Sequence, residues 1–357
     1  MLRRQTILIR DQDIILILFI AYGLLSVFLT SLIGFSMMKG FREFALFIPY
    51  LFYFPVREYI QETKRYKPIL WTLIFVGTVV ALVNVIRYRE AIAIANYLFE
   101  VWGKRQVVEE PLYMGAIVIL LSLVILIQRK YHVFLLIMLS VNIFSLAVTF
   151  SRGYWMATIF ASCLLIILNR SIARSKLIIT IGVLCLIGVS VTIIIFPGIF
   201  QSFGQGIMMR VASIGVNDIS LRTRLSEART VIRLIYKSPI VGYGLGSMFS
   251  YYDLITKYYV TNWYIHNGYL FLLFKFGIIG TILFLIYYIK QTLNCYHAFR
   301  NETNNDLRPV FIGFFSISIT MLLLSFTSPQ FYDRASVLLL STIWGLNDGL
   351  TMDHEHA

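Results

Sequence analysis

His266 stands at the point where a long polar loop meets an apolar segment, in the stretch YIHNGYL. A neutral imidazole at such a place can accept a proton from a hydroxyl group. Taken alone, a histidine at this kind of junction is more often a packed structural residue than a base. His266 is therefore a candidate whose role depends on the groups around it.

Four arginines lie upstream in the same loop, in the stretch LRTRLSEARTVIRLIYKSP over residues 221–239. At about 100° per residue, one apolar face holds Leu221, Leu225, Ala228, Ile232 and Ile235. One flank of that face carries Arg222, Arg229 and Arg233, while Arg224 falls on the other flank. The pattern predicts an amphipathic helix ended by Pro239. Its arginines either meet lipid phosphates at the membrane surface or bind a substrate phosphate, which suits the two-pronged guanidinium.

Two further cations lie in or beside apolar segments. Arg152, in TFSRGYWMA, joins two apolar segments almost without a loop. It either reaches toward headgroups or points inward, and the tight turn favours the inward orientation. Lys275 lies inside an apolar segment and is either a cavity residue or the partner of a charge on another helix. The glycines of GYGLGS, residues 242–247, predict a tight turn rather than a dinucleotide site, because no strand precedes them.

The elements that must position these residues are membrane helices. Of the 357 residues, 58% are hydrophobic and only 14% are charged, against about a quarter charged in soluble domains. Apolar blocks of about 20 residues can cross a bilayer. We expect an all-α, polytopic bundle of about ten spans within a single membrane domain, 1–357. The predicted spans are 14–36, 41–56, 68–86, 111–128, 131–150, 152–169, 176–196, 267–289, 308–327 and 334–350.

Lysine and arginine in the short loops predict the orientation. Their distribution places both termini inside and the large loop 197–266, between the seventh and eighth spans, outside the cytoplasm. The net charge of +13 therefore indicates anionic lipid headgroups or phosphorylated lipid substrates as partners, not nucleic acid. The three cysteines form no disulfide framework, and the histidines show no metal-ligand spacing, so we expect no metal and no cofactor.

Three of these motifs in this order resemble the O-antigen ligase and Wzy-type polysaccharide polymerase superfamily. They are TFSRGYWMA with Arg152, then Arg224 followed by PIVGYGLGS, then His266-Asn267 opening IHNGYLFLLFKFGIIG. The resemblance covers roughly residues 145–285. It implies that His266, Arg224 and Arg152 are catalytic. Asn267, which the resemblance pairs with His266, is expected to help bind the substrate, and so are Arg222, Arg229 and Arg233 of the predicted helix.

What the resemblance implies is a metal-independent glycosyltransferase in the cytoplasmic membrane of a bacterium. Such an enzyme moves an oligo- or polysaccharide from a polyprenyl diphosphate to a sugar acceptor on the outer face, in O-antigen, lipopolysaccharide, capsule or exopolysaccharide synthesis. Arginines would stabilise the leaving diphosphate and a base would activate the acceptor hydroxyl. Polymerase and ligase remain open, because they differ in the acceptor. A flippase or a chain-length regulator would be a partner in a complex.

Two other classes of function fit a membrane protein of this length. A flippase for lipid-linked sugars, or another polysaccharide transporter, would carry internal repeats and charges near the membrane midplane. This sequence shows neither clearly, and its polar residues gather in one outer loop. In a membrane scaffold without activity, the positions of Arg152, Arg224 and His266 would be incidental. An assay for chain growth separates these classes.

Overall fold

The computed structural model describes residues 10–63, 65–94, 109–124, 132–169, 175, 178–179, 182, 219–304 and 307–351. Within these ranges helices predominate, and two short strands form a hairpin. The chain divides into two compact units. The first unit comprises Met1–Pro49, Ile219–Asn294 and Ser325–Tyr332, and the second comprises Tyr50–Asp218, Cys295–Leu324 and Asp333–Ala357.

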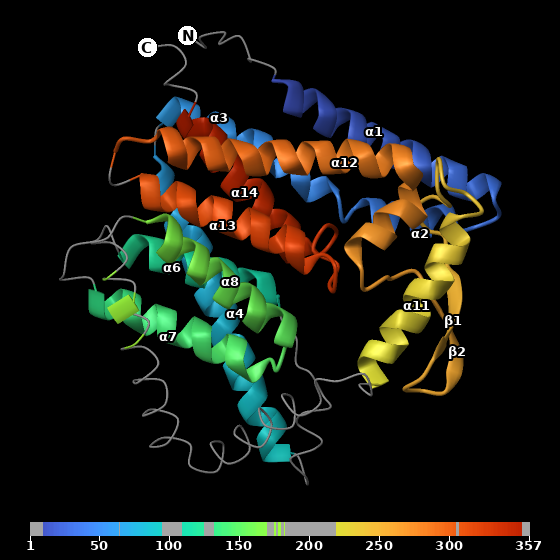
Figure 1. Cartoon of the computed structure of the whole chain (residues 1–357), viewed down its shortest axis with the longest axis horizontal. Helices are drawn as coiled ribbons and strands as arrows, with labels where there is room; N and C mark the ends of the chain where they lie inside the picture. The colour runs from blue at the N-terminus through green and yellow to red at the C-terminus, as the bar shows by residue number, and fades with distance from the viewer. Residues whose placement is uncertain are drawn as a thin grey trace. The chain divides into compact units, whose positions relative to one another are not determined.

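The first unit is built on two long antiparallel helices, α1 (Asp11–Leu32) and α12 (Gly268–Asn301). The Tyr22 hydroxyl donates to the Phe276 carbonyl at 3.1 Å, and the rings of Phe19 and Phe284 are 5.0 Å apart. The two helices run in opposite directions, as Figure 1 shows. The unit also contains α2 (Met37–Phe44), α11 (Ile219–Ile235), β1 (Phe249–Asp253) and β2 (Tyr258–Asn262).

Helix α1 exposes an apolar face and buries a partly polar one. Ile17, Leu18 and Leu25 are about half exposed, whereas Ser26 and Thr30 are buried. A helix in water would show the opposite arrangement, so this face is suited to lipid. Within the described ranges, three helices are long and apolar enough to cross a membrane, namely Asp11–Leu32, Tyr66–Glu90 and Gly268–Asn301. Shorter apolar helices are Glu110–Val124, Val133–Val148, Arg152–Leu168 and Arg308–Leu324.

The second unit is a helical bundle around α6 (Glu110–Val124), which is buried along nearly its whole length. Its other elements are α3 (Tyr53–Thr63), α4 (Tyr66–Ile94), α7 (His132–Val148), α8 (Arg152–Leu168), α13 (Arg308–Leu324) and α14 (Arg334–Thr351). Helix α6 packs against α4, α7, α8, α13 and α14. Amide and hydroxyl groups tie α4 to α7, because the Asn84 side chain donates to Ser145 Oγ at 3.0 Å. Asn142 donates to Thr78 in the same interface. Such interhelical bonds are typical of membrane bundles.

A buried polar cluster joins α3 to α14. The hydroxyl of Tyr53 donates to a carboxylate oxygen of Asp348 at 2.6 Å, and Arg57 donates to the same hydroxyl at 3.1 Å. Asp348 is fully buried. Its charge is therefore matched by donors inside the bundle, which explains how an aspartate is tolerated in a buried helix.

The prediction of about ten spans is not confirmed. The stretch 41–56, expected as one span, is instead the end of α2, a 3₁₀ turn over Ile48–Phe52 and the start of α3. Pro49 lies in that turn, where the missing amide hydrogen prevents a continuous helix. The expected span 176–196 lies almost entirely outside the described residues. Of the loop 197–266, the structure describes residues 219–266, which contain one helix and a hairpin that was not expected.

Candidate functional site

His266 is fixed at the start of α12 by its neighbours on both sides. The side chain of Asn267 accepts the Leu270 amide hydrogen at 3.0 Å and so caps the helix. On the other side, the Tyr332 hydroxyl accepts the Ile265 amide hydrogen and donates to the Ile265 carbonyl. Burial raises the pKa of the Tyr332 hydroxyl well above its usual range, so this group keeps its proton. The backbone that carries His266 is therefore held in one conformation.

The imidazole of His266 faces a carboxylate from the loop helix. Glu227 Oε2 lies 2.8 Å from His266 Nδ1, and Glu227 Oε1 accepts the His266 backbone amide hydrogen at 2.7 Å. The Glu227 side chain is 2% exposed, while the His266 side chain is 32% exposed. One buried carboxylate thus contacts both the ring and the backbone of an accessible histidine.

Helix α11 supplies that carboxylate because it packs through a partly polar face. Thr223, Glu227 and Val231 are buried, and Ser226 Oγ donates to the Tyr252 carbonyl of β1 at 3.0 Å. The expected apolar stripe points outward, since Leu221, Leu225 and Ile232 are each at least 40% exposed. Flanking this stripe, the side chains of Arg222, Arg229 and Arg233 are also exposed. The helix is amphipathic as predicted, and its outward face suits a membrane surface.

Arg224 leaves the other flank of α11, again as predicted, and reaches the connection between α13 and α14. Its Nη1 donates to the Thr327 carbonyl at 3.0 Å. In the same connection, Asn267 Nδ2 donates to the Phe326 carbonyl at 2.9 Å, and the Gly268 amide donates to Ser325 at 2.8 Å. Arg224 and the start of α12 therefore bind the same short segment, Ser325–Thr327.

The glycine-rich stretch after Pro239 lies against a break in α12. Gly277 has φ of 61° and ψ of −166°, which interrupts the helix and opens its backbone hydrogen bonds. The loop closes them, because the amides of Tyr243 and Gly244 donate to the carbonyls of Phe274 and Lys275 at 2.8 and 2.9 Å. Beyond the break, the Ile278 amide donates to the Pro239 carbonyl at 2.8 Å.

These contacts give the glycines a second role besides the predicted tight turn. A Cβ at Gly242 would lie 2.6 Å from the Gly277 nitrogen, so both chains approach closely because both positions are glycine. Irregular backbone at membrane depth must be paired within the protein. The glycine-rich stretch thus completes the broken helix as well as reversing the chain.

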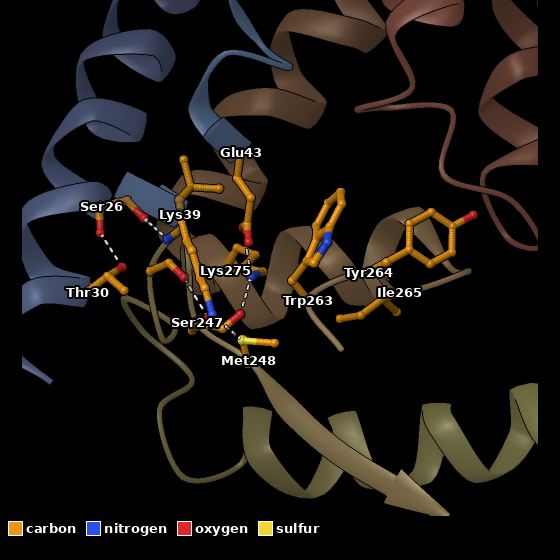
Figure 2. A network of polar contacts seen from close by, with 12 residues as sticks. Ser26, Thr30, Lys39, Glu43, Ser247, Met248, Trp263, Tyr264, Ile265 and Lys275 are labelled. Carbon is orange, nitrogen blue, oxygen red and sulfur yellow. Dashed lines mark hydrogen bonds and ion pairs between the residues drawn. The ribbon is translucent and has the colours of Figure 1, made fainter. Parts of the chain in front are cut away.

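Lys275, whose role was open, is paired. Its Nζ lies 2.8 Å from a carboxylate oxygen of Glu43 on α2 and donates to the Ser247 carbonyl at 2.6 Å. Figure 2 shows this cluster beside α1, where Ser26 Oγ accepts the Leu245 amide hydrogen at 3.0 Å. Both charged side chains are almost completely buried. Lys275 is therefore a structural cation that anchors Ser247, the last residue of the glycine-rich stretch.

Arg152 belongs to the second unit, where it opens α8. The α7 helix ends at Val148, so the connection between the helices is as short as predicted. Phe150 takes a positive φ of 51°, and Trp155 Nε1 donates to the Leu146 carbonyl at 2.9 Å. These contacts fix the turn from which the Arg152 side chain leaves.

Sequence patterns did not single out Glu227 as a site residue. Its spacing from Arg224, one helical turn, was the available signal that both side chains leave neighbouring positions on the helix. Its pairing with His266 had no sequence signal, because many residues separate them. Glu43 and Tyr332 were missed for the same reason. Among the described residues, no group of three or more histidine, cysteine or acidic side chains could hold a metal ion.

Comparison with known proteins gives one family match. Residues 133–285 match the family model described as O-antigen ligase, which covers less than half of the chain. The matched range contains Arg152, α11, the glycine-rich stretch and His266, and it begins close to the start of α7. No curated protein matches the chain. The family match confirms the resemblance drawn from the three motifs, because residues 133–285 are similar to the O-antigen ligase family.

Proposed function

We propose that the protein is a membrane glycosyltransferase that takes a saccharide from a polyprenyl diphosphate. The acceptor is a sugar hydroxyl, and the reaction takes place on the outer face of a bacterial cytoplasmic membrane. One observation carries the proposal. Arg224 and the carboxylate that holds His266 lie one turn apart on α11, inside the segment that matches the O-antigen ligase family.

The reaction needs one bond made, one bond broken and one proton moved. The acceptor oxygen attacks the anomeric carbon, and the bond from that carbon to the diphosphate oxygen breaks with its electron pair leaving on the diphosphate. The hydroxyl proton passes to His266, since a hydroxyl group is a weak nucleophile until it is deprotonated. The reaction is also faster when donor and acceptor are held close together in one site than when they meet in solution.

Arginine suits the leaving diphosphate because its charge is permanent and its planar group can make two parallel bonds. Arg224 now donates to a neutral carbonyl of Thr327. A phosphate oxygen is a charged and stronger acceptor, so binding of the donor would draw Arg224 from that carbonyl. Arg152 takes a similar role by resemblance, and the exposed Arg222, Arg229 and Arg233 suit lipid or substrate phosphates.

The proposal includes both a polymerase and a ligase. In a polymerase the acceptor is another lipid-linked repeat unit, and in a ligase it is the sugar of a different lipid. We propose that neither needs a metal, because arginines and a histidine supply the charge stabilisation and the base.

Purified protein in nanodiscs, given a polyprenyl-diphosphate-linked oligosaccharide and a sugar acceptor with excess chelator, tests this proposal. We expect free polyprenyl diphosphate and a transferred or lengthened saccharide in equal amounts. Arg224→Ala is the matched inactive control. If the chelator stops the reaction, the metal-independent mechanism is wrong. If vesicles show movement of the donor between leaflets with no new glycosidic bond, the protein is a transporter.

A further inference from the structure

We infer that Glu227 is the positioning residue of the site, which holds His266 in the one neutral tautomer that can act as a base through Nε2. The inference rests on the proposed transfer reaction and assigns a residue to it. Glu227 is buried, comes from α11 and reaches across to the chain entering α12. The family match supplies the reaction class, whereas this assignment comes from the hydrogen bonds alone.

The two oxygens of Glu227 have different partners, and together these determine the tautomer. Oε1 accepts the backbone amide hydrogen of His266 at 2.7 Å, and Oε2 lies 2.8 Å from Nδ1. An ionised carboxylate can only accept hydrogen bonds. Nδ1 must therefore carry the hydrogen of the neutral ring, which leaves the lone pair on Nε2. A proton taken at Nε2 forms an imidazolium, and the adjacent carboxylate stabilises that charge.

The different burial of Glu227 and His266 gives the two side chains different roles. The Glu227 side chain is 2% exposed and the His266 side chain is 32% exposed, so a sugar hydroxyl can approach the ring but not the carboxylate. The ring of Tyr264 lies edge-on to the imidazole at 5.0 Å between centroids, which limits its rotation. Glu227 thus acts through His266 and does not touch the substrate.

The substitution Glu227→Gln separates this role from a purely structural one. The glutamine oxygen must face the His266 backbone amide, because that group is only a donor. The glutamine NH₂ then faces Nδ1, which must become the acceptor, and the ring hydrogen moves to Nε2. Shape and both hydrogen bonds are kept, but the lone pair of Nε2 is lost. If Glu227 only anchored the backbone, the glutamine would serve equally well.

The experiment measures turnover and KM for the lipid-linked donor in wild type, Glu227→Gln and Asp253→Asn, with thermal unfolding to confirm folding. Asp253→Asn is the control, because Asp253 is another loop carboxylate that contacts α11, through Thr223. We expect Glu227→Gln to lose about a hundredfold or more in kcat with little change in donor KM, and Asp253→Asn to keep kcat. Near wild-type kcat in folded Glu227→Gln overturns the inference while leaving the proposed function intact. An inactive wild type overturns the function instead.

A spectroscopic readout tests the tautomer without the reaction. Nitrogen-15 NMR of histidine-labelled protein at a pH where the ring is neutral should show His266 with hydrogen on Nδ1, assigned by its loss in His266→Gln. In Glu227→Gln the hydrogen should be on Nε2. Wild-type protein with hydrogen on Nε2 would overturn the assignment whatever the activity of the variants.

Discussion

The ammonium of Lys275 lies 2.8 Å from the carboxylate of Glu43, and the two side chains are 0% and 6% exposed. The Lys275 ammonium also donates to the Ser247 carbonyl, so a single cation joins α2, α12 and the end of the glycine-rich stretch. Removing one member of such a pair leaves an uncompensated charge in a buried position. This relationship makes the first prediction.

Lys275→Met should lower the stability of the protein more than Glu43→Gln does. The methionine leaves the Glu43 charge and the Ser247 carbonyl without their donor, a loss of about 3 to 5 kcal/mol for a buried pair. The glutamine still offers an oxygen to the ammonium, so its cost should be smaller. Thermal unfolding in detergent measures both. Equal unfolding midpoints for the two variants would mean that the charge pair has no special role. The double variant Lys275→Met with Glu43→Leu should recover part of the lost stability, because it leaves no unpaired charge.

Gly277→Ala should destabilise the first unit, because the substitution adds strain and a collision. The backbone at Gly277 lies in a region open essentially to glycine, which costs other residues about 1 to 3 kcal/mol. A Cβ there would also meet the Ile240 carbonyl. Gly34→Ala is the matched control, since Gly34 has a φ of 88° and nothing within 4 Å of its added Cβ. Unfolding midpoints should fall further for Gly277→Ala, and equal falls would argue against the close approach of the two chains.

Local patterns predicted those features of this protein that depend on neighbouring residues. The helix expected over 221–239 is α11, which ends at Ile235, and the short connection before Arg152 is present. Its arginines also lie as expected, with Arg224 apart from the others. Helical periodicity requires only the residues of one turn, so a single sequence carries that information.

Features that depend on distant partners could not be predicted in the same way. The hairpin of β1 and β2 is rich in tyrosine, yet β-propensity depends too strongly on packing context to predict a hairpin from these residues alone. Which face of α11 is buried depends on its contacts with β1 and with His266. Glu43, the partner of Lys275, lies on α2, in a stretch that the sequence predicted as the start of a membrane span. The break at Gly277 is favourable only because Pro239–Gly244 supplies hydrogen-bond partners beside it.

The third prediction concerns the side of the membrane on which the hairpin lies. A reporter inserted at Thr256, in the exposed turn between the strands, should be active outside the cytoplasm, and one fused after Thr351 should be active inside. The reason is the excess of lysine and arginine in the loops assigned to the inside. Paired alkaline phosphatase and fluorescent protein fusions measure this. Cytoplasmic activity at Thr256 would reverse the orientation and remove the outer-face reaction.

The fourth prediction separates Arg224 from the other loop arginines. Arg224→Ala should abolish saccharide transfer with normal protein levels, and Arg224→Lys should also be impaired, because an ammonium cannot make two parallel bonds to a phosphate. Arg152→Ala should behave like Arg224→Ala. Arg229→Ala and Arg233→Ala should be milder, since those side chains leave the opposite flank of α11. Equal losses in every alanine variant would show that the helix acts only as a general positive surface.

The last prediction concerns His266 itself. His266→Gln keeps a side chain of similar reach that can still meet Glu227, but it has no basic nitrogen. If the imidazole removes the acceptor proton, turnover at saturating donor should fall by about a hundred- to ten-thousand-fold. Donor affinity should change little, because the proposal assigns binding of the diphosphate to the arginines. Raising the pH, which increases the fraction of acceptor hydroxyl already ionised, should restore part of the lost rate in His266→Gln. The measurement is the initial rate and donor binding across pH for wild type, His266→Gln and His266→Ala. Near wild-type turnover in His266→Gln would mean that the ring only orients the acceptor, and that the proton leaves by another group.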